Sequence, residues 1–166
     1  MANLSLTRVN QKLMQAKLLL QSAEGQGLTA VQLHAILEGA AFHLVCAYHH
    51  YLREIAETYN LKNAIALRTE ADLVTAFETA KKYPAEAEEL VSLRKEPASW
   101  LAQLQVYYDF LWRTPVISTT GQETGLISLV DEDKAEAVAV NLERLTQWQR
   151  QFVELVIRQR ATSAEF

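Results

Sequence analysis

All four histidines and the single cysteine of the chain lie in one segment, residues 34–50. At about 100° per residue, a helix would place His43, Cys46 and His50 within about 60° of one another, with Glu54 beside them. Imidazole, thiolate and carboxylate groups are the usual ligands of zinc and other transition metals. His43, Cys46, His50 and Glu54 therefore form a candidate ligand face.

The spacing of these residues argues against a metal centre. A zinc site normally needs three or four ligands that converge on one point, whereas groups at i, i+3 and i+7 climb about 10 Å along a helix. No other segment supplies a histidine or cysteine, and the Glu-x-x-His pattern of di-iron bundles is absent because Ala41 stands three residues after Glu38. We favour a polar helix face and expect neither a metal nor a cofactor.

A second polar set, His34, Glu38 and His49, interrupts the broad apolar arc of the same segment. We expect these three side chains to point inward and form a candidate polar pocket. A buried carboxylate must be paired or protonated, because an isolated charge costs several kcal/mol to desolvate. Two interpretations stay open: a hydrogen-bonded network that orients the core, which we favour, and a site for proton transfer or a small ligand.

No recognised catalytic motif accompanies these residues. The motif of helical nucleases, an arginine followed closely by a histidine, is missing because Arg8 precedes the histidines by far and none follows Arg53. Cys46 falls in mid-helix, where a small buried apolar residue is expected, and there is no glycine-flanked serine or phosphate-binding glycine loop. The sequence therefore favours a protein that is not an enzyme.

Aromatic side chains gather in residues 100–112, where they could stack on nucleobases if basic residues lay beside them. Only Arg113 adjoins the run. The stripe at helical spacing comprises Trp100, Leu104, Tyr107 and Leu111. Core packing is therefore favoured, and Phe110 and Trp112, which fall off the stripe, indicate a second buried surface. With a net charge of −4, we expect no nucleic-acid partner.

Length and composition predict one domain over residues 1–166. The chain is 49% apolar and 22% charged, which suits one core with an ordinary solvated surface. A lone cysteine and an N-terminus without an apolar leader suggest the cytoplasm. No stretch approaches the roughly 20 apolar residues of a membrane span, so no membrane partner is expected.

The elements that carry these side chains are predicted to be helices, because five glycines and three prolines leave long uninterrupted intervals. The expected fold is an all-α, single-domain bundle of four long helices with a short inserted helical pair. The long helices are predicted over residues 5–23, 29–59, 97–114 and 131–160. The short pair is predicted over residues 69–83 and 84–93, and an ordered loop or short hairpin over 114–130.

Two helix starts carry capping-box signals, Thr29 with Gln32 and Thr69 with Asp72. Pro84 and Pro97 suit the first turns of two others. Apolar residues of the last helix extend beyond one narrow stripe, namely Val140, Val153 and Ile157. Such width predicts burial on two sides, either within the bundle or in a homodimer.

Several segments, in order along most of the chain, resemble a family of small uncharacterised gammaproteobacterial proteins, catalogued as a domain of unknown function. The segments that carry the resemblance are 1–3, 7–12, 42–44, 54–59, 99–104 and 148–158. The likeness is weakest over residues 61–89 and 114–130. It implies a bacterial origin and a compact fold, and it implies no activity or residue role.

The expected function is a non-enzymatic helical module that binds an unidentified protein or a second copy of itself. The alternative is a bundle that binds a small molecule or a metal in the polar pocket around His34, Glu38 and His49. A cavity at that place would favour the alternative.

Overall fold

The computed structural model describes residues 4–25, 27–113 and 140–163. These residues form helices and connecting turns, which confirms the predicted all-α class. The helices are α1 (Leu4–Ser22), α2 (Ala30–Thr58), the 3-10 turn η1 (Ala64–Ala66), α3 (Glu70–Thr79), α4 (Ala85–Lys95), α5 (Trp100–Phe110) and α6 (Leu142–Ser163).

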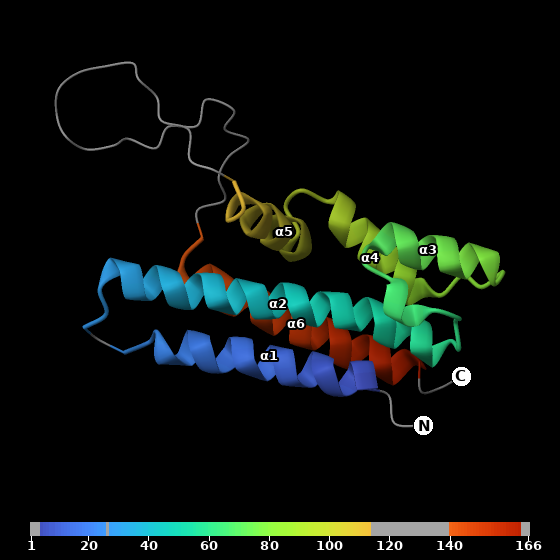
Figure 1. Cartoon of the computed structure of the whole chain (residues 1–166), viewed down its shortest axis with the longest axis horizontal. Helices are drawn as coiled ribbons and strands as arrows, with labels where there is room; N and C mark the ends of the chain where they lie inside the picture. Colours follow the sequence, from blue (N-terminus) through green and yellow to red (C-terminus); the bar gives the residue numbers. More distant parts are fainter. Residues whose placement is uncertain (1–3, 26, 114–139, 164–166) are drawn as a thin grey trace, which may run out of the picture.

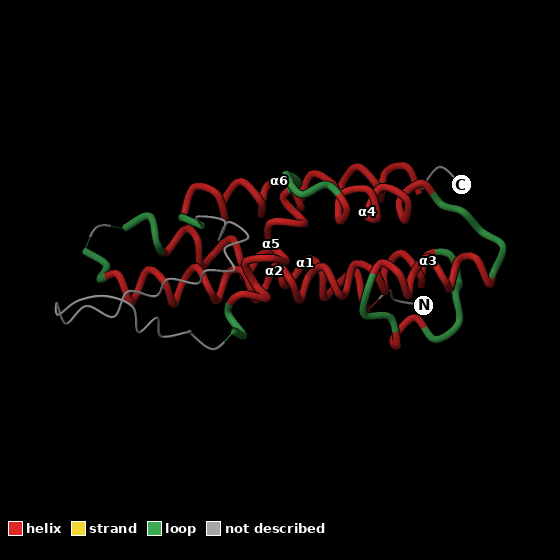
Figure 2. The backbone as a smooth tube through the Cα atoms, turned by 90° about the horizontal axis from the view of Figure 1, so that it is seen from above, coloured by secondary structure: helices red, strands yellow, loops and turns green. Residues whose placement is uncertain are grey.

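Three long helices, α1, α2 and α6, lie side by side, and the three short ones cover α2 and α6 (Figure 1). Figure 2, turned by 90°, separates α4 on the side of α6 from α3 on the side of α2. The expected count of four long helices is wrong within the described residues, because α5 has 11 residues. The Ser99 hydroxyl accepts a hydrogen bond from the Ala102 amide (3.1 Å), so α5 begins at Trp100 and Pro97 lies outside it.

Both predicted capping boxes are present and start their helices where expected. Thr29 Oγ1 accepts from the Gln32 amide (3.2 Å), and Gln32 Oε1 accepts from the Thr29 amide (2.8 Å). Thr69 and Asp72 make the same reciprocal pair at 3.1 and 2.9 Å. Each pair satisfies two amides that a helix start leaves without partners.

Two other boundaries differ from the prediction. α3 ends at Thr79 rather than near Tyr83, because Lys81 is left-handed (φ 54°) and the Lys82 amide bonds back to the Phe77 oxygen (3.0 Å), which closes the helix. Pro84 precedes α4 as its N-cap.

Within the described residues α6 begins at Leu142, where Asn141 Oδ1 accepts from the Arg144 amide (2.8 Å) and caps the helix. The predicted loop over 114–130 and the start at Asp131 lie outside the described residues.

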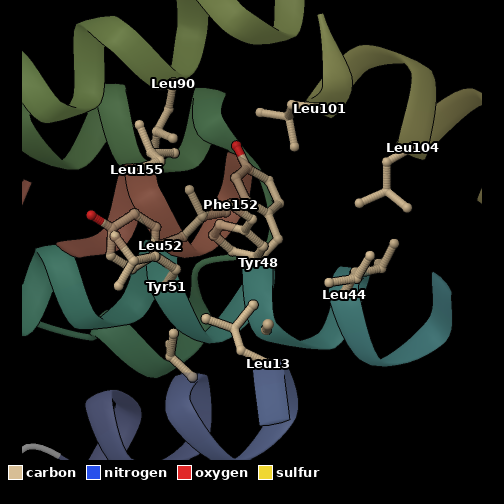
Figure 3. Close-up of a cluster of buried hydrophobic side chains, with 14 of the residues drawn as sticks. Leu13, Leu44, Tyr48, Tyr51, Leu52, Leu90, Leu101, Leu104, Phe152 and Leu155 are labelled. Carbon is tan, nitrogen blue, oxygen red and sulfur yellow. The ribbon is translucent and has the colours of Figure 1, made fainter. Parts of the chain in front are cut away.

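One hydrophobic core joins the layers around Phe152 of α6 (Figure 3). Its ring stacks on Trp100 at 5.0 Å and meets the edges of Tyr48 and Tyr51 at 6.2 and 6.0 Å. Leucines from the surrounding helices close this centre: Leu13, Leu44, Leu52, Leu90, Leu101, Leu104 and Leu155. The first half of the predicted aromatic stripe is therefore core.

The second buried surface predicted at Phe110 and Trp112 is wrong for the single chain. The two side chains are 46% and 76% exposed. The reason is their position: the buried residues of α5 are in its first turns, at Trp100, Leu101, Ala102 and Leu104, and Phe110 and Trp112 lie beyond them.

The length and composition of α2 correct the expectation that no stretch of the chain approaches a membrane span. By length and composition this 29-residue helix could cross a bilayer, a test that the core helix of a soluble protein also passes. In the structure α2 packs against α1, α5 and α6, and its inward residues are buried among them. The absence of a membrane partner stays a prediction.

Candidate functional site

The predicted polar pocket around His34, Glu38 and His49 does not form. His34 and Glu38 are exposed, and His49 is half-buried. Glu38 lies seven residues before the buried Val45 and therefore on the same side of α2. Leu37, Ala40 and Ala41 beside it are buried, so this part of α2 is packed, while Glu38 lies at the edge of the packed face with its side chain in water.

Of these three residues, His49 is the one whose side chain is partly buried. Its Nδ1 is buried and has no hydrogen-bond partner. Burial lowers the pKa of His49, and the nearby guanidinium of Arg53 lowers it further, against a raising effect of the Arg68 backbone. The neutral imidazole is thus the form that fits this position.

The candidate ligand face is divided among different partners. His43 Nδ1 lies 3.5 Å from Lys12 Nζ, and burial together with Lys12 lowers the pKa of His43. Burial raises the pKa of the Cys46 thiol and lowers the pKa of His50. Within the described residues, no three His, Cys, Asp or Glu side chains gather where a metal ion could bind. The absence of a metal from the working protein stays a prediction.

Glu54, the fourth residue of that face, belongs to a buried ion pair. Its carboxylate is 4% exposed and accepts two hydrogen bonds from Arg160, from Nε at 2.6 Å and from Nη2 at 2.9 Å. Arg160 Nη1 donates to Asn10 at 2.8 Å. The pair therefore ties α2, α6 and α1 together at one end of the molecule.

A second buried carboxylate, Glu86, lies in the first turn of α4 beside this pair. It is 6% exposed and accepts hydrogen bonds from Ser163 Oγ (2.6 Å) and from the Tyr59 hydroxyl (3.1 Å). Burial raises the pKa of Tyr59, and the negative charge of Glu86 adds to the rise. The Tyr59 hydroxyl thus stays protonated and acts as a donor.

Gln159 of α6 links Tyr51 in the core to Glu89 of α4. The Tyr51 hydroxyl donates to Gln159 Oε1 (2.6 Å), and Gln159 Nε2 donates to Glu89 (2.7 Å). Glu89 also accepts from Arg158, and these hydrogen bonds lower its pKa. Burial raises the pKa of Tyr51 far above its ordinary value.

A pocket of about 240 Å³ opens at this end of the molecule, and we call it the end pocket. Its walls come from α1, α2, α4 and α6, with Tyr59 just beyond the end of α2. The lining residues are Leu6, Tyr51, Glu54, Ile55, Thr58, Tyr59, Glu86, Arg160 and Ser163. Charged and apolar groups thus face the same small space.

A larger groove of about 680 Å³ runs between α1 and α6, and we call it the α1–α6 groove. Apolar side chains alternate with polar or charged ones along both of its walls. The residues that line it are Asn10, Leu13, Met14, Lys17 and Gln21 from α1, and Gln149, Arg150, Val153, Glu154, Val156, Ile157 and Arg160 from α6.

The sequence analysis identified Glu54 and missed Glu86 and Arg160. Glu86 stands among the acidic and alanine residues that open α4, a composition typical of a solvated helix face. Arg160 is 106 residues from Glu54, and no spacing rule links the two. The wide apolar surface of the last helix was predicted to be buried, but Val153 and Ile157 line the open α1–α6 groove, and Ile157 is 63% exposed.

Comparison with known proteins gives a family and no activity. No curated protein and no solved structure matches the chain. A family model, described as a family of unknown function (DUF6586), matches residues 1–166. The match spans the three long helices together with the end pocket and the α1–α6 groove, and it agrees with the resemblance seen in the sequence. The chain therefore belongs to this family of unknown function.

Proposed function

We propose that the protein is a non-enzymatic helical module that binds protein, and that its partner in the α1–α6 groove is a second copy of the same chain. The observation that carries the proposal is the groove itself. Its walls are two antiparallel helices, and such a groove accepts a further amphipathic helix. We propose further that it acts in the cytoplasm of a bacterium, a proposal that the sequence resemblance and the lone cysteine support.

Apolar side chains on both walls lack cover in the single chain. Met14 is 52% exposed on α1, and Ile157 is 63% exposed on α6. Leu18 follows Met14 by one turn and is 57% exposed, while Val153 precedes Ile157 by one turn. Burying these rows against matching rows would contribute about 25 cal/mol for each Å² of apolar surface removed from water.

The charges at the groove favour a second copy over an unrelated helix. Arg150 and Glu154 lie one helical turn apart on the same wall. A two-fold axis between two antiparallel α6 helices would bring each Arg150 opposite the other copy's Glu154. A helix face that carries a positive and a negative residue in this order is complementary to itself. The two Arg150–Glu154 pairs would fix how the α6 helices of the two copies align along each other.

Sedimentation equilibrium of the purified protein tests the proposal. We expect a dimer with a micromolar dissociation constant, about −8 kcal/mol. Ile157→Glu should give monomer with an unchanged circular dichroism spectrum. Ile65→Glu is the matched control, because Ile65 is 76% exposed on η1, away from the groove, and this variant should dimerise like the wild type.

Two results would overturn the second copy as partner. One is a wild-type protein that stays monomeric up to about 100 µM, a concentration well above a micromolar dissociation constant. The other is a dimer that Ile157→Glu leaves intact, which would place the contact elsewhere. Charge reversal tests the proposed pairs directly. Arg150→Glu should weaken the dimer because it places a second carboxylate opposite Glu154, and the double variant Arg150→Glu with Glu154→Arg should restore the dimer because the pairs form again with their charges exchanged.

A further inference from the structure

Among the described residues, one carboxylate of the end pocket, that of Glu86, has no ion-pairing partner. Glu54 is paired with Arg160, and Glu89 is paired with Arg158. In the region that the structure describes, no lysine or arginine lies within ion-pairing distance of Glu86.

Two nearby groups do not supply the missing charge. Lys82 Nζ donates to the backbone oxygen of Tyr59 (2.6 Å). The amide dipoles at the start of α4 favour a carboxylate there, but they amount to about half a unit charge. The negative charge of the Glu86 carboxylate is therefore only partly compensated by these groups.

The position of Glu86 makes this partly compensated charge costly. The side chain is 6% exposed, and its present partners are the neutral hydroxyls of Ser163 and Tyr59. A buried charge is stabilised best by an opposite charge with hydrogen bonds. A ligand with one positive charge would complete the site without disturbing the Glu54–Arg160 pair.

The walls of the pocket restrict what such a cation can be. A volume of about 240 Å³ lies below the range of about 300–1,000 Å³ that is typical of sites for drug-sized ligands. Leu6, Ile55 and the ring of Tyr59 give the cavity an apolar side. An aromatic ring and a carboxylate together favour an alkylated cation, through cation–π attraction and charge-assisted hydrogen bonds.

Other ligand classes fit less well. Arg160 is the guanidinium that faces the pocket, and its bidentate bonds to Glu54 leave it no free charge for an anion. A hard divalent cation takes about six oxygen ligands. In this pocket the carboxylate without an ion pair is that of Glu86, and its oxygens already accept hydrogen bonds from two hydroxyls. The pocket therefore offers too few oxygen ligands for a divalent cation.

We propose that the end pocket binds a small organic monocation, a primary alkylammonium, whose N–H groups donate to the Glu86 carboxylate while its alkyl chain lies against Leu6 and Ile55. The end pocket shares Arg160 with the α1–α6 groove, but Glu86, Leu6 and Ile55 do not line the groove, so this proposal is tested independently of the proposed dimer.

The test is a ¹H–¹⁵N correlation titration of the full chain with propylammonium chloride at constant chloride concentration. We expect saturable shifts in the last turns of α2 and α6 and the first turn of α4, with millimolar affinity, about −4 kcal/mol. Sodium chloride and sodium propionate should give no saturable shift there, because sodium lacks the alkyl chain and propionate has the wrong charge.

Variants locate the binding charge. Glu86→Gln keeps the size of the side chain and removes its charge, so affinity for propylammonium should fall at least about tenfold. Glu88→Gln is the matched control, because Glu88 is an exposed residue of the same helical turn. It changes the net charge equally and should leave affinity unchanged. Leu6→Trp, which fills the cavity and leaves Glu86 in place, should also abolish binding.

Three results would overturn the proposal. The first is an absence of saturable shifts up to about 100 mM propylammonium, far above a millimolar dissociation constant. The second is equal weakening by Glu86→Gln and Glu88→Gln, which would reduce the effect to net charge. The third is undiminished binding in Leu6→Trp, since binding must then occur outside the cavity.

Discussion

Two glutamates near opposite ends of α2 differ in burial. Glu38, near its start, is exposed, whereas Glu54, near its end, is buried and held by Arg160. Glu38 lies on the side of the buried Val45 and about 160° around the helix from Glu54, so lying on a side that is buried elsewhere is not enough to bury it. The difference is in the neighbours: α4 and the last turns of α6 meet α2 at its end.

The comparison teaches that periodicity specifies the inward side of a helix, whereas the covering elements specify how far along that side burial extends. Figure 3 shows the covered part, where Tyr48, Tyr51 and Leu52 of α2 meet Phe152 and Leu155 of α6. A polar residue in an apolar arc is therefore buried only where another helix reaches it.

The largest expected effect comes from removing the centre of the covered part. Phe152→Ala deletes a ring with no exposed surface and leaves a void among Trp100, Tyr48 and Tyr51, so we expect a loss of about 3–5 kcal/mol in the free energy of unfolding. Phe42→Ala is the control at the open end, where the ring is 46% exposed, and should cost less than about 1 kcal/mol. Urea unfolding measures both, and similar losses would abolish the distinction between the two ends.

The next effect tests the buried ion pair. Arg160→Met keeps most of the side-chain volume but leaves the Glu54 carboxylate buried without its cation, which should cost about 3 kcal/mol. Arg158→Met breaks a more exposed pair with Glu89 and should cost about 0–1 kcal/mol. A smaller loss of unfolding free energy for Arg160→Met than for Arg158→Met in urea would contradict this. It would mean that water reaches the Glu54 carboxylate and that this end of α2 is more open than described.

A smaller effect depends on pH. Burial lowers the pKa of His43, His49 and His50 below the ordinary value of 6.5, so the unfolded chain binds protons more readily than the folded one. The stability from these neutral imidazoles is complete well above pH 6.5 and is lost as pH falls below that value.

His49 can be separated from the other histidines by substitution. His49→Gln should reduce the decline in unfolding free energy between about pH 7.5 and pH 5.5, the interval around the ordinary histidine pKa. His34→Gln, at the exposed end, is the matched control and should leave the decline unchanged. An equal reduction in both variants would mean that the decline does not report burial.

The smallest expected effect is at Glu38. Because its side chain is exposed, Glu38→Ala should change the free energy of unfolding by less than about 0.5 kcal/mol. Glu54→Ala, at the covered end of the same helix, should be clearly more destabilising in the same urea experiment. A loss of about 2 kcal/mol or more for Glu38→Ala would show that a partner covers the first turns of α2 in solution.

Local features of the fold were predictable because their causes are local. Thr29 with Gln32 and Thr69 with Asp72 start their helices through contacts three residues apart. The early end of α3 and the cap at Asn141 were missed, because many sequences allow a helix to continue through such residues.

The candidate site was less predictable, because its partners come from distant segments. Glu86 accepts from Ser163, 77 residues away, and Glu54 from Arg160, 106 residues away. Helical periodicity reports which residues share a side, and it carries no information on which other helix arrives there. The inward trio failed for this reason. The two-sided burial expected for the last helix is not seen at Ile157, which is 63% exposed in the single chain, so burial of that side in a homodimer stays a prediction.

The position of α6 has a consequence for how the protein is made. On the ribosome α1 and α2 emerge together and can pair early, but the helix that supplies Phe152, Arg160 and Ser163 is translated after all the others. Until it arrives, α2 presents apolar side chains to water and Glu54 remains hydrated. A pause or premature stop before α6 would therefore release an incomplete chain of the kind that chaperones and proteases retain and degrade.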